Sequence, residues 1–325
     1  MSSQRDTFIT GLFERAKEDK DICLISVDMG APSLDQWRQE LPNQFIAAGI
    51  SEQNAINYAA GLSAAGKKVY VYFMASWVAR CFEQIRYSCA MANNPITILG
   101  NGVALGYAPA GPAHEPNEDI AYMRTLCGIE IYSPSNSEFV KSLVDLTCDH
   151  PKLRYIRLER SYPDVLNNLY NLGKLSKQFL DMGMYPVFPG LAEPPRESRP
   201  KICILSSGYM LGRSHAVYKK LLENGYETTV VDVWKAKPLD LQHFVRTVAP
   251  YDMLVTIEEQ TLSGGFGSVI CELVSDGNLK KSILRIGLPE KYIFENGNRE
   301  HLLNTNGLSV DEIYDKIIKF HRCQK

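Results

Sequence analysis

The stretch GISEQNAINYAAGLSAAGKKVYVY, residues 49–72, contains a helix signal followed directly by a strand signal. Ser51 stands where an N-cap is expected, and a helix is predicted over 52–65 with Glu52 in its first turn. The β-branched and aromatic run at 68–73 predicts a buried strand. Small residues dominate one face of the helix: Ala55, Ala59, Ala60, Gly61, Ala64 and Ala65. A helix with so little bulk lets another backbone approach closely, which favours a tight subunit interface.

The same alternation of strand and helix signals extends along the first half of the chain. Strands are predicted at 21–27, 44–49, 68–73, 95–100, 129–132 and 153–158. Helices are predicted at 6–19, 52–65, 77–92, 117–126 and 136–148. Short apolar strands that alternate with helices are typical of a parallel sheet covered by helices on both faces.

This alternation stops after Arg160, and residues 161–200 are rich in proline and glycine. Such a composition predicts a linker or a surface excursion. A second α/β pattern follows, with strands predicted at 201–207, 227–232, 253–258 and 281–286 and helices at 211–224, 239–248, 265–275 and 309–320. We therefore expect a first domain over 1–165, a linker over 166–199 and a smaller second domain over 200–325.

The composition argues against several classes of protein. The 325 residues carry a formal net charge of −2 and no basic stripe, so we expect neither nucleic acid nor a membrane surface as a partner. The N-terminus lacks the apolar core of a secretory signal, and no apolar run approaches the ~20 residues of a membrane span. The eight cysteines form no CxxC pair and the six histidines do not cluster. Reduced thiols, no metal site within the chain and a cytoplasmic location are therefore expected.

Four motifs carry a resemblance to a known family. They are FIAAGISEQNAINYAAGLSAAGKKVYVY (45–72), FEQIRYS (82–88), GPAHEPNEDIAYMR (111–124) and EEQTLSGGFGS (258–268). Their order and spacing resemble the transketolase family over nearly the whole chain, and least over 161–200. The resemblance implies an α/β fold in which a parallel-sheet pyrimidine-binding domain precedes a smaller α/β C-terminal domain.

The resemblance gives Glu52 a second interpretation. A glutamate in the first turn of a helix commonly only complements the helix dipole. The family's cofactor is thiamine diphosphate, and Glu52 matches the glutamate that hydrogen-bonds N1′ of the aminopyrimidine and so assists loss of the thiazolium C2 proton. His114 matches the active-site histidine, which contacts substrate oxygens near that carbon. The resemblance therefore implies that Glu52 and His114 are catalytic residues.

Three apolar residues are candidates for contacts to the cofactor. In the family an aromatic ring stacks on the aminopyrimidine within the segment that corresponds to FMASWVARCFEQIR (73–86). Trp77 aligns best with that ring and Phe73 is the second candidate, and the alternative interpretation of this segment is an ordinary core aromatic. Met29, in SVDMGAPS, resembles an apolar residue that packs under the cofactor, and simple core packing explains it equally well.

A phosphate site is implied by Arg5, Ser33 and Arg160, which resemble the residues that hold a sugar phosphate in transketolases. Arginine can bind a phosphate group through two parallel N–H···O hydrogen bonds. The alternative interpretation is that Arg5 and Arg160 are exposed arginines without a ligand. The glycines of 258–268 are typical of a phosphate loop, but the resemblance places this segment in the C-terminal domain, with a structural role at the domain interface.

A complete transketolase has a further N-terminal domain, whose GDG motif and a later Asn hold the diphosphate and Mg²⁺. No GDG occurs in this chain. The resemblance therefore implies the catalytic C-terminal subunit of a two-chain transketolase, with a separate N-terminal subunit in an α2β2 heterotetramer. It would transfer a two-carbon ketol unit from a ketose or ketose phosphate to an aldose. The alternatives are the β subunit of a 2-oxo acid dehydrogenase and a non-catalytic partner subunit.

Two positions depart from the family's pattern. Ala110 stands where transketolases have an Asp, four residues before His114, that reads the C2 hydroxyl of the acceptor. Gly102 stands where they have a His near the phosphate end. Both departures remove a polar group and are expected to widen the channel. We expect weak discrimination at acceptor C2, or a preference for a deoxygenated, modified or bulkier sugar.

Overall fold

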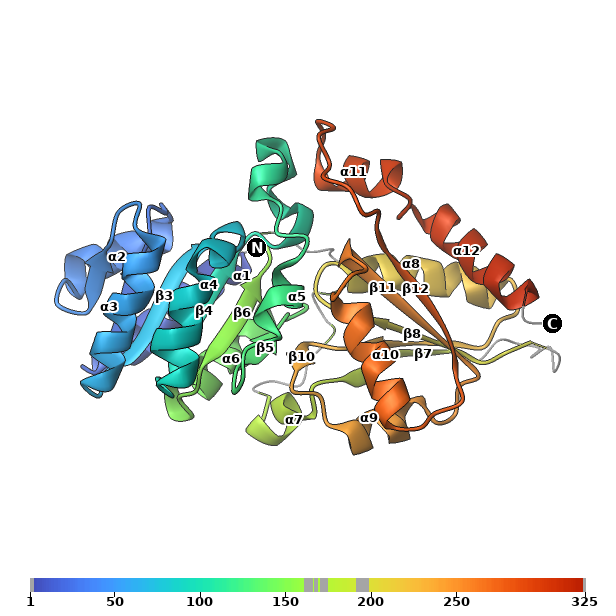
Figure 1. Cartoon of the computed structure of the whole chain (residues 1–325), viewed down its shortest axis with the longest axis horizontal. Helices are drawn as coiled ribbons and strands as arrows, with labels where there is room; N and C mark the ends of the chain where they lie inside the picture. Colours follow the sequence, from blue (N-terminus) through green and yellow to red (C-terminus); the bar gives the residue numbers. More distant parts are fainter. Residues whose placement is uncertain (1–2, 161–165, 167–168, 170–174, 191–198, 324–325) are drawn as a thin grey trace.

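The computed structural model describes residues 3–160, 166, 169, 175–190 and 199–323. In this part the chain forms two α/β units, each built on its own sheet, which stand side by side in Figure 1. None of the helices described is long and apolar enough to cross a membrane.

The first sheet has the strand order β10–β5–β6–β4–β3–β1–β2. Six of its strands are parallel: β1 (Ile22–Ser26), β2 (Phe45–Ala47), β3 (Lys68–Met74), β4 (Ile96–Asn101), β5 (Glu130–Tyr132) and β6 (Arg154–Leu158). The seventh, β10 (Lys235–Lys237), comes from the second half of the chain and pairs antiparallel with β5. All six strands that the sequence predicts for this unit are present.

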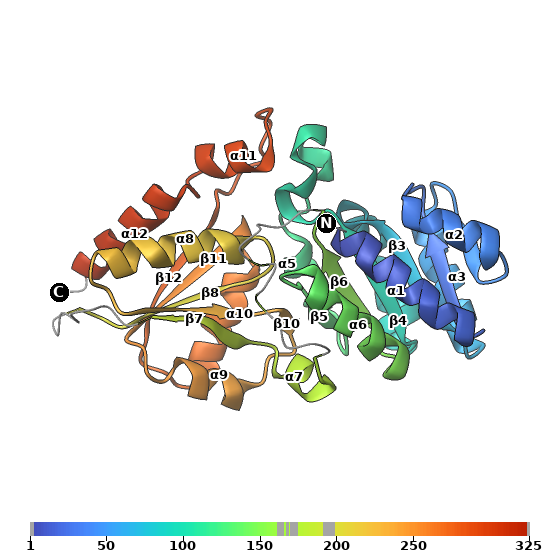
Figure 2. The ribbon, with the colours of Figure 1, turned by 180° about the vertical axis from the view of Figure 1, so that it is seen from behind.

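Helices cover both faces of this sheet (Figures 1 and 2). One face carries α1 (Gln4–Glu18), α2 (Pro32–Glu40) and α6 (Ser137–Asp149). The other face carries α3 (Glu52–Ala64), the segment 75–91 and α5 (Asp119–Met123). Successive residues of β3 explain the two layers, because Tyr70 and Tyr72 pack into the first core while Val71 and Phe73 pack into the second.

The small residues of α3 bring this helix close to its own sheet. Ala55, Ala59 and Ala60 are buried in the core of the first unit, whereas Gly61 and Ala64 are exposed. The helical period therefore divides the small residues between two sides of α3. The prediction that the small helix face favours a tight subunit interface does not hold for Ala55, Ala59 and Ala60, which pack in the core of their own unit.

The segment predicted as one helix over 77–92 is irregular. It forms a 3₁₀ helix at Ala75–Cys81, a short α-turn at α4 (Phe82–Gln84) and a π-helix at Ile85–Met91. Helical segments of these less common types frequently mark functional positions. Here the 3₁₀ helix holds Trp77 and Arg80 directly after the carboxyl end of β3.

The second sheet has the strand order β12–β11–β8–β9–β7. Its parallel strands are β8 (Ile202–Ser206), β9 (Thr228–Asp232), β11 (Met253–Thr261) and β12 (Ser282–Leu288). Its helices are α8 (Met210–Glu223), α9 (Leu241–Val248), α10 (Phe266–Asp276), α11 (Arg299–Thr305) and α12 (Val310–Arg322). The predicted fold class, a parallel-sheet α/β unit followed by a smaller α/β unit, is confirmed.

Two elements lie in the range that the sequence assigned to a linker. They are α7 (Lys177–Met182) and β7 (Tyr185–Gly190), and β7 pairs antiparallel with β9 at the edge of the second sheet. Pro186 and Pro189 interrupt the strand signal of β7, and a strand at a sheet edge tolerates them. Residues 165 and 200 stay as proposed domain boundaries.

Buried polar contacts join the two units. Arg299 of α11 donates to Glu259 at the end of β11 (Nε to Oε1, 2.8 Å) and to Glu159 of the first unit (Nη1 to Oε2, 2.7 Å). Gln260 donates to Asp119, which also accepts from Arg157 (Nε to Oδ2, 2.8 Å). We name these six residues the interunit network. Its members are Asp119, Arg157, Glu159, Glu259, Gln260 and Arg299.

Candidate functional site

Most of the candidate residues lie at the carboxyl edge of the first sheet, where open parallel sheets bind their ligands. Each follows a strand: Met29 follows β1, Glu52 follows β2, Trp77 follows β3, His114 follows β4 and Arg160 follows β6. The turns of 104–114, between β4 and α5, rise from this edge beside α11 (Figure 1). Phe73 lies inside β3 instead.

Glu52 is a buried carboxylate at the first position of α3. Only 4% of the residue is exposed, and Arg80 Nη1 donates to its Oε2 at 3.1 Å. The Ser51 hydroxyl group donates to the carbonyl of Ala48 and does not cap α3. A glutamate that only complemented the helix dipole could stay at the surface, where water solvates its charge. Because burial of a charge costs free energy, the burial of Glu52 favours a more specific role.

Two further contacts link Glu52 and Arg80 to Trp77 and His114. The Arg80 guanidinium lies over the Trp77 ring at 5.1 Å from its centroid. The same ring meets the His114 imidazole edge to face, with 5.4 Å between centroids. Within the described residues Nδ1 of His114 is buried and has no hydrogen-bond partner. We name Glu52, Trp77, Arg80 and His114 the Glu52 cluster.

The two other cofactor candidates have different surroundings. Phe73 has 0% exposure and packs wholly within the core between β3 and its covering helices. A ring enclosed in this way has no face left for a ligand, whereas Trp77 is half-buried. Met29 is also half-buried and packs against the core under α1 and α2. Its carbonyl oxygen accepts from the Ser26 hydroxyl group at 3.3 Å.

Two of the three phosphate candidates meet at one carboxylate. Asp6 accepts from Arg5 (Nη2 to Oδ2, 2.9 Å) and from the Ser33 hydroxyl group (2.8 Å to Oδ1). Arg160 is exposed and contacts the Tyr107 ring, with 4.7 Å from its guanidinium carbon to the ring centroid. We name Arg5, Asp6, Ser33, Tyr107 and Arg160 the arginine cluster.

The two departures from the family pattern behave differently. Ala110 is exposed, so its small side chain leaves space around it. Gly102 leaves none, because a Cβ atom built on it would lie 2.0 Å from Cδ2 and Cε2 of Tyr107. The expectation of a wider channel at Gly102 was wrong: the Tyr107 ring fills that volume.

Glu115 lies beside His114 in the chain and faces carboxylates of the second unit. It is 5% exposed, and neither carboxylate oxygen has a hydrogen-bond partner among the described residues. Burial and the nearby carboxylates of Glu259 and Glu295 raise the pKa of Glu115 to about 7. Burial also raises the pKa of Glu258 to about 8, although the backbone N–H of Gly267 donates to it at 2.9 Å.

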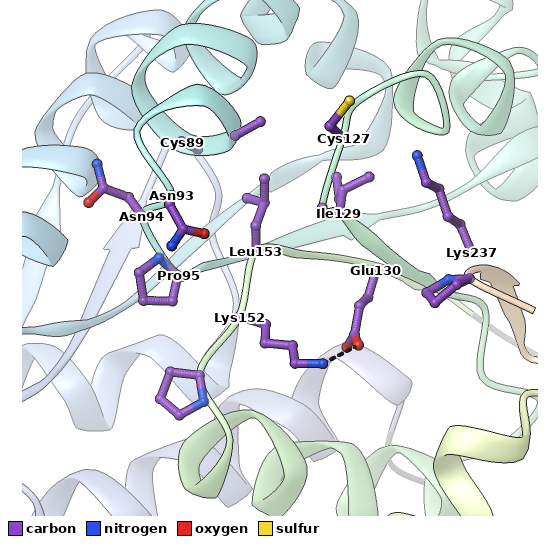
Figure 3. Close-up of a pocket in the computed structure, with 14 residues that line it drawn as sticks. Cys89, Asn93, Asn94, Pro95, Cys127, Ile129, Glu130, Lys152, Leu153 and Lys237 are labelled. Carbon is purple, nitrogen blue, oxygen red and sulfur yellow. Dashed lines mark hydrogen bonds and ion pairs between the residues drawn. The ribbon is translucent and has the colours of Figure 1, made fainter.

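A cavity of about 550 Å³ lies at the opposite edge of the first sheet, at the amino ends of β4, β5 and β6 (Figure 3). Its charged side chains have partners: Lys152 Nζ contacts Glu130 at 2.9 Å, and Lys237 donates to the carbonyls of Arg124 and Leu126, both at 2.6 Å. Neither the position of this cavity nor the chemistry of its side chains favours it over the carboxyl edge as the functional site.

Sequence reasoning missed three residues of the candidate site. Arg80 follows Trp77 by three residues, which is a spacing that places two side chains on one helical face. Asp6 is the chain neighbour of Arg5 and could have been found as its counter-charge. Tyr107 has no comparable signal, because only the folded loop places its ring over Gly102.

Two family models match the chain. The model "Transketolase, pyrimidine binding domain" matches residues 3–163, and the model "Transketolase, C-terminal domain" matches residues 190–313. Each match falls on one of the two α/β units described above.

Two named enzymes are similar to this chain over 98% of its length. The chain is 30% identical to one of the subunits of the apulose-4-phosphate transketolase of Phocaeicola vulgatus, over 98% of each chain. It is 28% identical to a 1-deoxy-D-xylulose-5-phosphate synthase of Caldanaerobacter subterraneus subsp. tengcongensis, of which it spans 49%.

Two solved structures share the fold. One is a split-gene transketolase described as an inactive β4 tetramer, with a TM-score of 0.83 and 24% identity over 100% of both chains. The other is a transketolase from Pichia stipitis, with a TM-score of 0.77 and 16% identity over 99% of this chain and 46% of that one. Together with the matched models, the 30% identity over nearly the full length shows that this chain belongs to the transketolase family.

Proposed function

We propose that the chain is the catalytic subunit of a two-chain, thiamine diphosphate-dependent transketolase that transfers a two-carbon ketol unit from a ketose or ketose phosphate to an aldose. One observation carries the proposal. The Glu52 cluster brings a buried carboxylate, a half-buried indole and an imidazole nitrogen into one continuous group at the carboxyl edge. The P. vulgatus relative, whose name makes it one of the subunits of a transketolase, supports the two-chain form.

The residues of the Glu52 cluster fit thiamine diphosphate. The chemistry that this cofactor supplies when bound is an acidic thiazolium carbon able to carry a two-carbon unit. Trp77 would support the flat aminopyrimidine with its accessible face, and Met29 would add an apolar contact. The buried Glu52 carboxyl would hold a proton against a ring nitrogen, with Arg80 as its present partner.

The remaining site residues would act on the substrate. Nδ1 of His114 is buried without a partner in the described part of the chain, so it would exchange a proton with a hydroxyl or carbonyl oxygen. Arg5, Ser33 and Arg160 would hold a phosphate group. A phosphate would compete with Asp6 for Arg5 and Ser33, whereas the exposed Arg160 guanidinium contacts an aromatic ring and would offer its N–H groups to a ligand.

The proposed partner is an N-terminal subunit that holds the diphosphate and Mg²⁺, in a cytoplasmic α2β2 assembly. Exposed apolar side chains lie just before α3, on α3 and on the π-helix, where we expect its contact. Ile50 and Met91 are 75% and 65% exposed, and Tyr58 and Tyr87 are also exposed. The Ser88 hydroxyl group donates to Asn57 at 2.8 Å, so the two helices are neighbours. Exposed apolar groups of this kind mark protein interfaces.

The test is co-expression with the natural N-terminal subunit, followed by assay against a panel of phosphorylated and unphosphorylated sugars. Ketol transfer without any lipoyl protein would support the proposal. Oxidative decarboxylation of a 2-oxo acid coupled to lipoyl acylation would instead identify a 2-oxo acid dehydrogenase β subunit. Absence of catalysis with that N-terminal chain would leave a non-catalytic partner.

The isolated chain provides a further test of the two-chain site. Without an N-terminal subunit to hold the diphosphate, it should give no measurable heat of binding with thiamine diphosphate and Mg²⁺ in calorimetry. The assembled complex should bind the cofactor. Tight binding by the isolated chain would contradict the division of the site between two chains.

A further inference from the structure

We propose that Tyr107 is a specificity-determining residue at the phosphate end of the site, where its ring fixes Arg160 and its hydroxyl group donates to a phosphate oxygen. The role assigned to Arg160 rests on the proposed function. Three contacts of Tyr107 carry the inference, and each involves a different neighbour: Gly102, Asn101 and Arg160.

The contact with Gly102 shows that the ring occupies a volume open only to glycine. Gly102 has φ +73° and its backbone N–H donates to the carbonyl of Leu158 at 2.9 Å, so its position is fixed by the adjoining strand β6. A Cβ atom there would lie 2.0 Å from two carbons of the Tyr107 ring. Any side chain at position 102 would therefore displace the ring.

The contact with Asn101 orients the hydroxyl group of Tyr107. Asn101, the last residue of β4, is fully buried, and its Nδ2 donates to the Tyr107 oxygen at 2.8 Å. Because the phenol oxygen accepts this bond, the phenol keeps its own hydrogen to donate elsewhere. The Oδ1 atom of Asn101 is buried without a partner in the described residues, so Asn101 has unused capacity to accept a hydrogen bond at the same place.

The contact with Arg160 fixes a cation that is otherwise exposed. Its guanidinium carbon lies 4.7 Å from the Tyr107 ring centroid, within the range of a cation–π interaction. Burial raises the pKa of a second tyrosine, Tyr72, which lies near both Tyr107 and Arg5.

A long arginine side chain loses rotational freedom when it binds a ligand, and a contact that restricts it beforehand reduces that loss. The Tyr107 ring supplies such a contact, and its phenol hydrogen is available at the same end of the site. We therefore expect Tyr107 to increase affinity for the phosphate group itself, with little effect on chemistry at the Glu52 cluster.

A phosphate titration of the 325-residue chain tests this inference without any need for catalysis. Inorganic phosphate is added to ¹⁵N-arginine-labelled protein, and the Arg160 side-chain NMR signal is assigned with Arg160→Lys. The variants are Tyr107→Leu, Tyr107→Phe and Tyr314→Leu. Tyr314 is a matched control because it is also half-buried and contacts a cation, Lys220 Nζ at 4.6 Å, on α12 of the second unit.

The expected result is phosphate binding at Arg160 in the wild type and in Tyr314→Leu. Affinity should fall about three- to tenfold in Tyr107→Leu, and by an intermediate factor in Tyr107→Phe, which keeps the ring. Equal affinity in Tyr107→Leu, or no effect of phosphate on Arg160 in the wild type, would overturn the inference.

Kinetics of the two-chain enzyme separate this role from a structural one. In Tyr107→Leu the KM of a phosphorylated acceptor should rise by a similar factor, with kcat within about twofold and the KM of the unphosphorylated analogue unchanged. Ketol transfer with unchanged KM values would reject the role of Tyr107 alone. Weaker phosphate binding in Tyr107→Leu without any ketol transfer would reject the proposed function alone.

Discussion

The interunit network and the Glu52 cluster both contain buried charged side chains, but they satisfy those charges differently. In the network Arg299 contacts Glu159 and Glu259, and its guanidinium carbon lies 3.7 Å from the centroid of the Tyr209 ring. In the Glu52 cluster Glu52 has one half-exposed partner, Arg80, and Nδ1 of His114 has none among the described residues.

This difference separates structural from functional burial of charge. A buried ion pair whose hydrogen-bonding groups are all used holds two surfaces together and leaves nothing to bind a ligand. Buried polar atoms without protein partners require another explanation, and a bound ligand is a common one. Within the described residues Oε1 of Gln260 in the network also lacks a partner, so the contrast is between the ion pairs of Arg299 and the Glu52 cluster. The unpartnered Nδ1 of His114 favours the Glu52 cluster as the place of chemistry.

The largest effect is expected for a substitution that breaks the interunit network. Arg299→Ala would leave Glu159 and Glu259 as adjacent buried carboxylates, so we expect a loss of about 3–5 kcal/mol in the free energy of unfolding. Urea denaturation measures this loss. The control is Arg38→Ala, because Arg38 lies in an exposed ion pair with Asp35 at 2.7 Å and should contribute less than about 1 kcal/mol.

A combined variant distinguishes lost pairing from lost packing. If uncompensated charge causes the instability, Glu159→Gln and Glu259→Gln should each recover part of it in the Arg299→Ala background. An equal loss in Arg299→Ala and Arg38→Ala would show that the network does not stabilise the junction of the two units.

The next effect concerns the Glu52 cluster. Glu52→Gln keeps the size of the side chain but cannot hold a proton in the same way, so exchange of the C2 hydrogen of bound thiamine diphosphate should slow by ~10²-fold or more. Hydrogen–deuterium exchange in the two-chain complex measures this rate. The exposed control Glu83→Gln should leave the rate unchanged. Near-normal exchange in Glu52→Gln would reduce Glu52 to a helix-end charge.

Glu115 follows His114 of the Glu52 cluster in the chain and lies near Glu259 of the interunit network. The pH dependence of stability therefore tests a buried carboxyl that neighbours both regions. Its folded-state pKa of about 7 is above its ordinary value, so the protonated form stabilises the fold fully at low pH. That contribution is lost as the pH rises from about 4.5 to about 7. Glu115→Gln has no carboxyl group to ionise and should not lose this contribution. Between about pH 4 and 8 the unfolding free energy of wild type should therefore fall by about 2–3 kcal/mol relative to that of Glu115→Gln.

Chemical denaturation across this pH range measures the Glu115 effect, and the exposed control Glu18→Gln should run parallel to wild type. A constant difference between Glu115→Gln and wild type would mean that the Glu115 carboxyl titrates normally. Glu115 would then resemble neither the buried ion pairs of the interunit network nor the buried groups of the Glu52 cluster.

Most of the fold could be predicted from the sequence because its strands are short, apolar and regularly spaced. The elements that escaped prediction lack such signals. The helix α2 buries only Leu34 and Trp37, and β10 consists of three residues, KAK, that pair with β5 across a long chain separation. Pairing over that distance depends on the folded arrangement of both units and leaves no local pattern.

The candidate site shows the same division. Glu52, Trp77 and His114 could be predicted from motifs, and the structure brings these three together. Their connection through Arg80, and the position of Tyr107 over Gly102, depend on the paths of the 3₁₀ segments after β3 and β4. Side-chain placement of this kind follows from loop geometry, which a single sequence does not specify.

The smallest expected effect concerns Ala110, the exposed position four residues before His114. A site built to hydrogen-bond a hydroxyl group rejects analogues that lack it, because its own polar group is then left without a partner. With Ala110 this penalty is absent, so we propose weak discrimination at acceptor C2. In Ala110→Asp the preference for the usual C2 configuration should rise about tenfold, since the bound acceptor would cover the new carboxylate and an unpaired buried polar group costs about 1–3 kcal/mol. The measurement is kcat/KM for aldose phosphates that differ only at C2. Thr125→Asp, an exposed substitution outside the carboxyl edge, is the control. A wild-type preference of about 100-fold, with no gain in Ala110→Asp, would show that another residue or the partner chain reads this hydroxyl group.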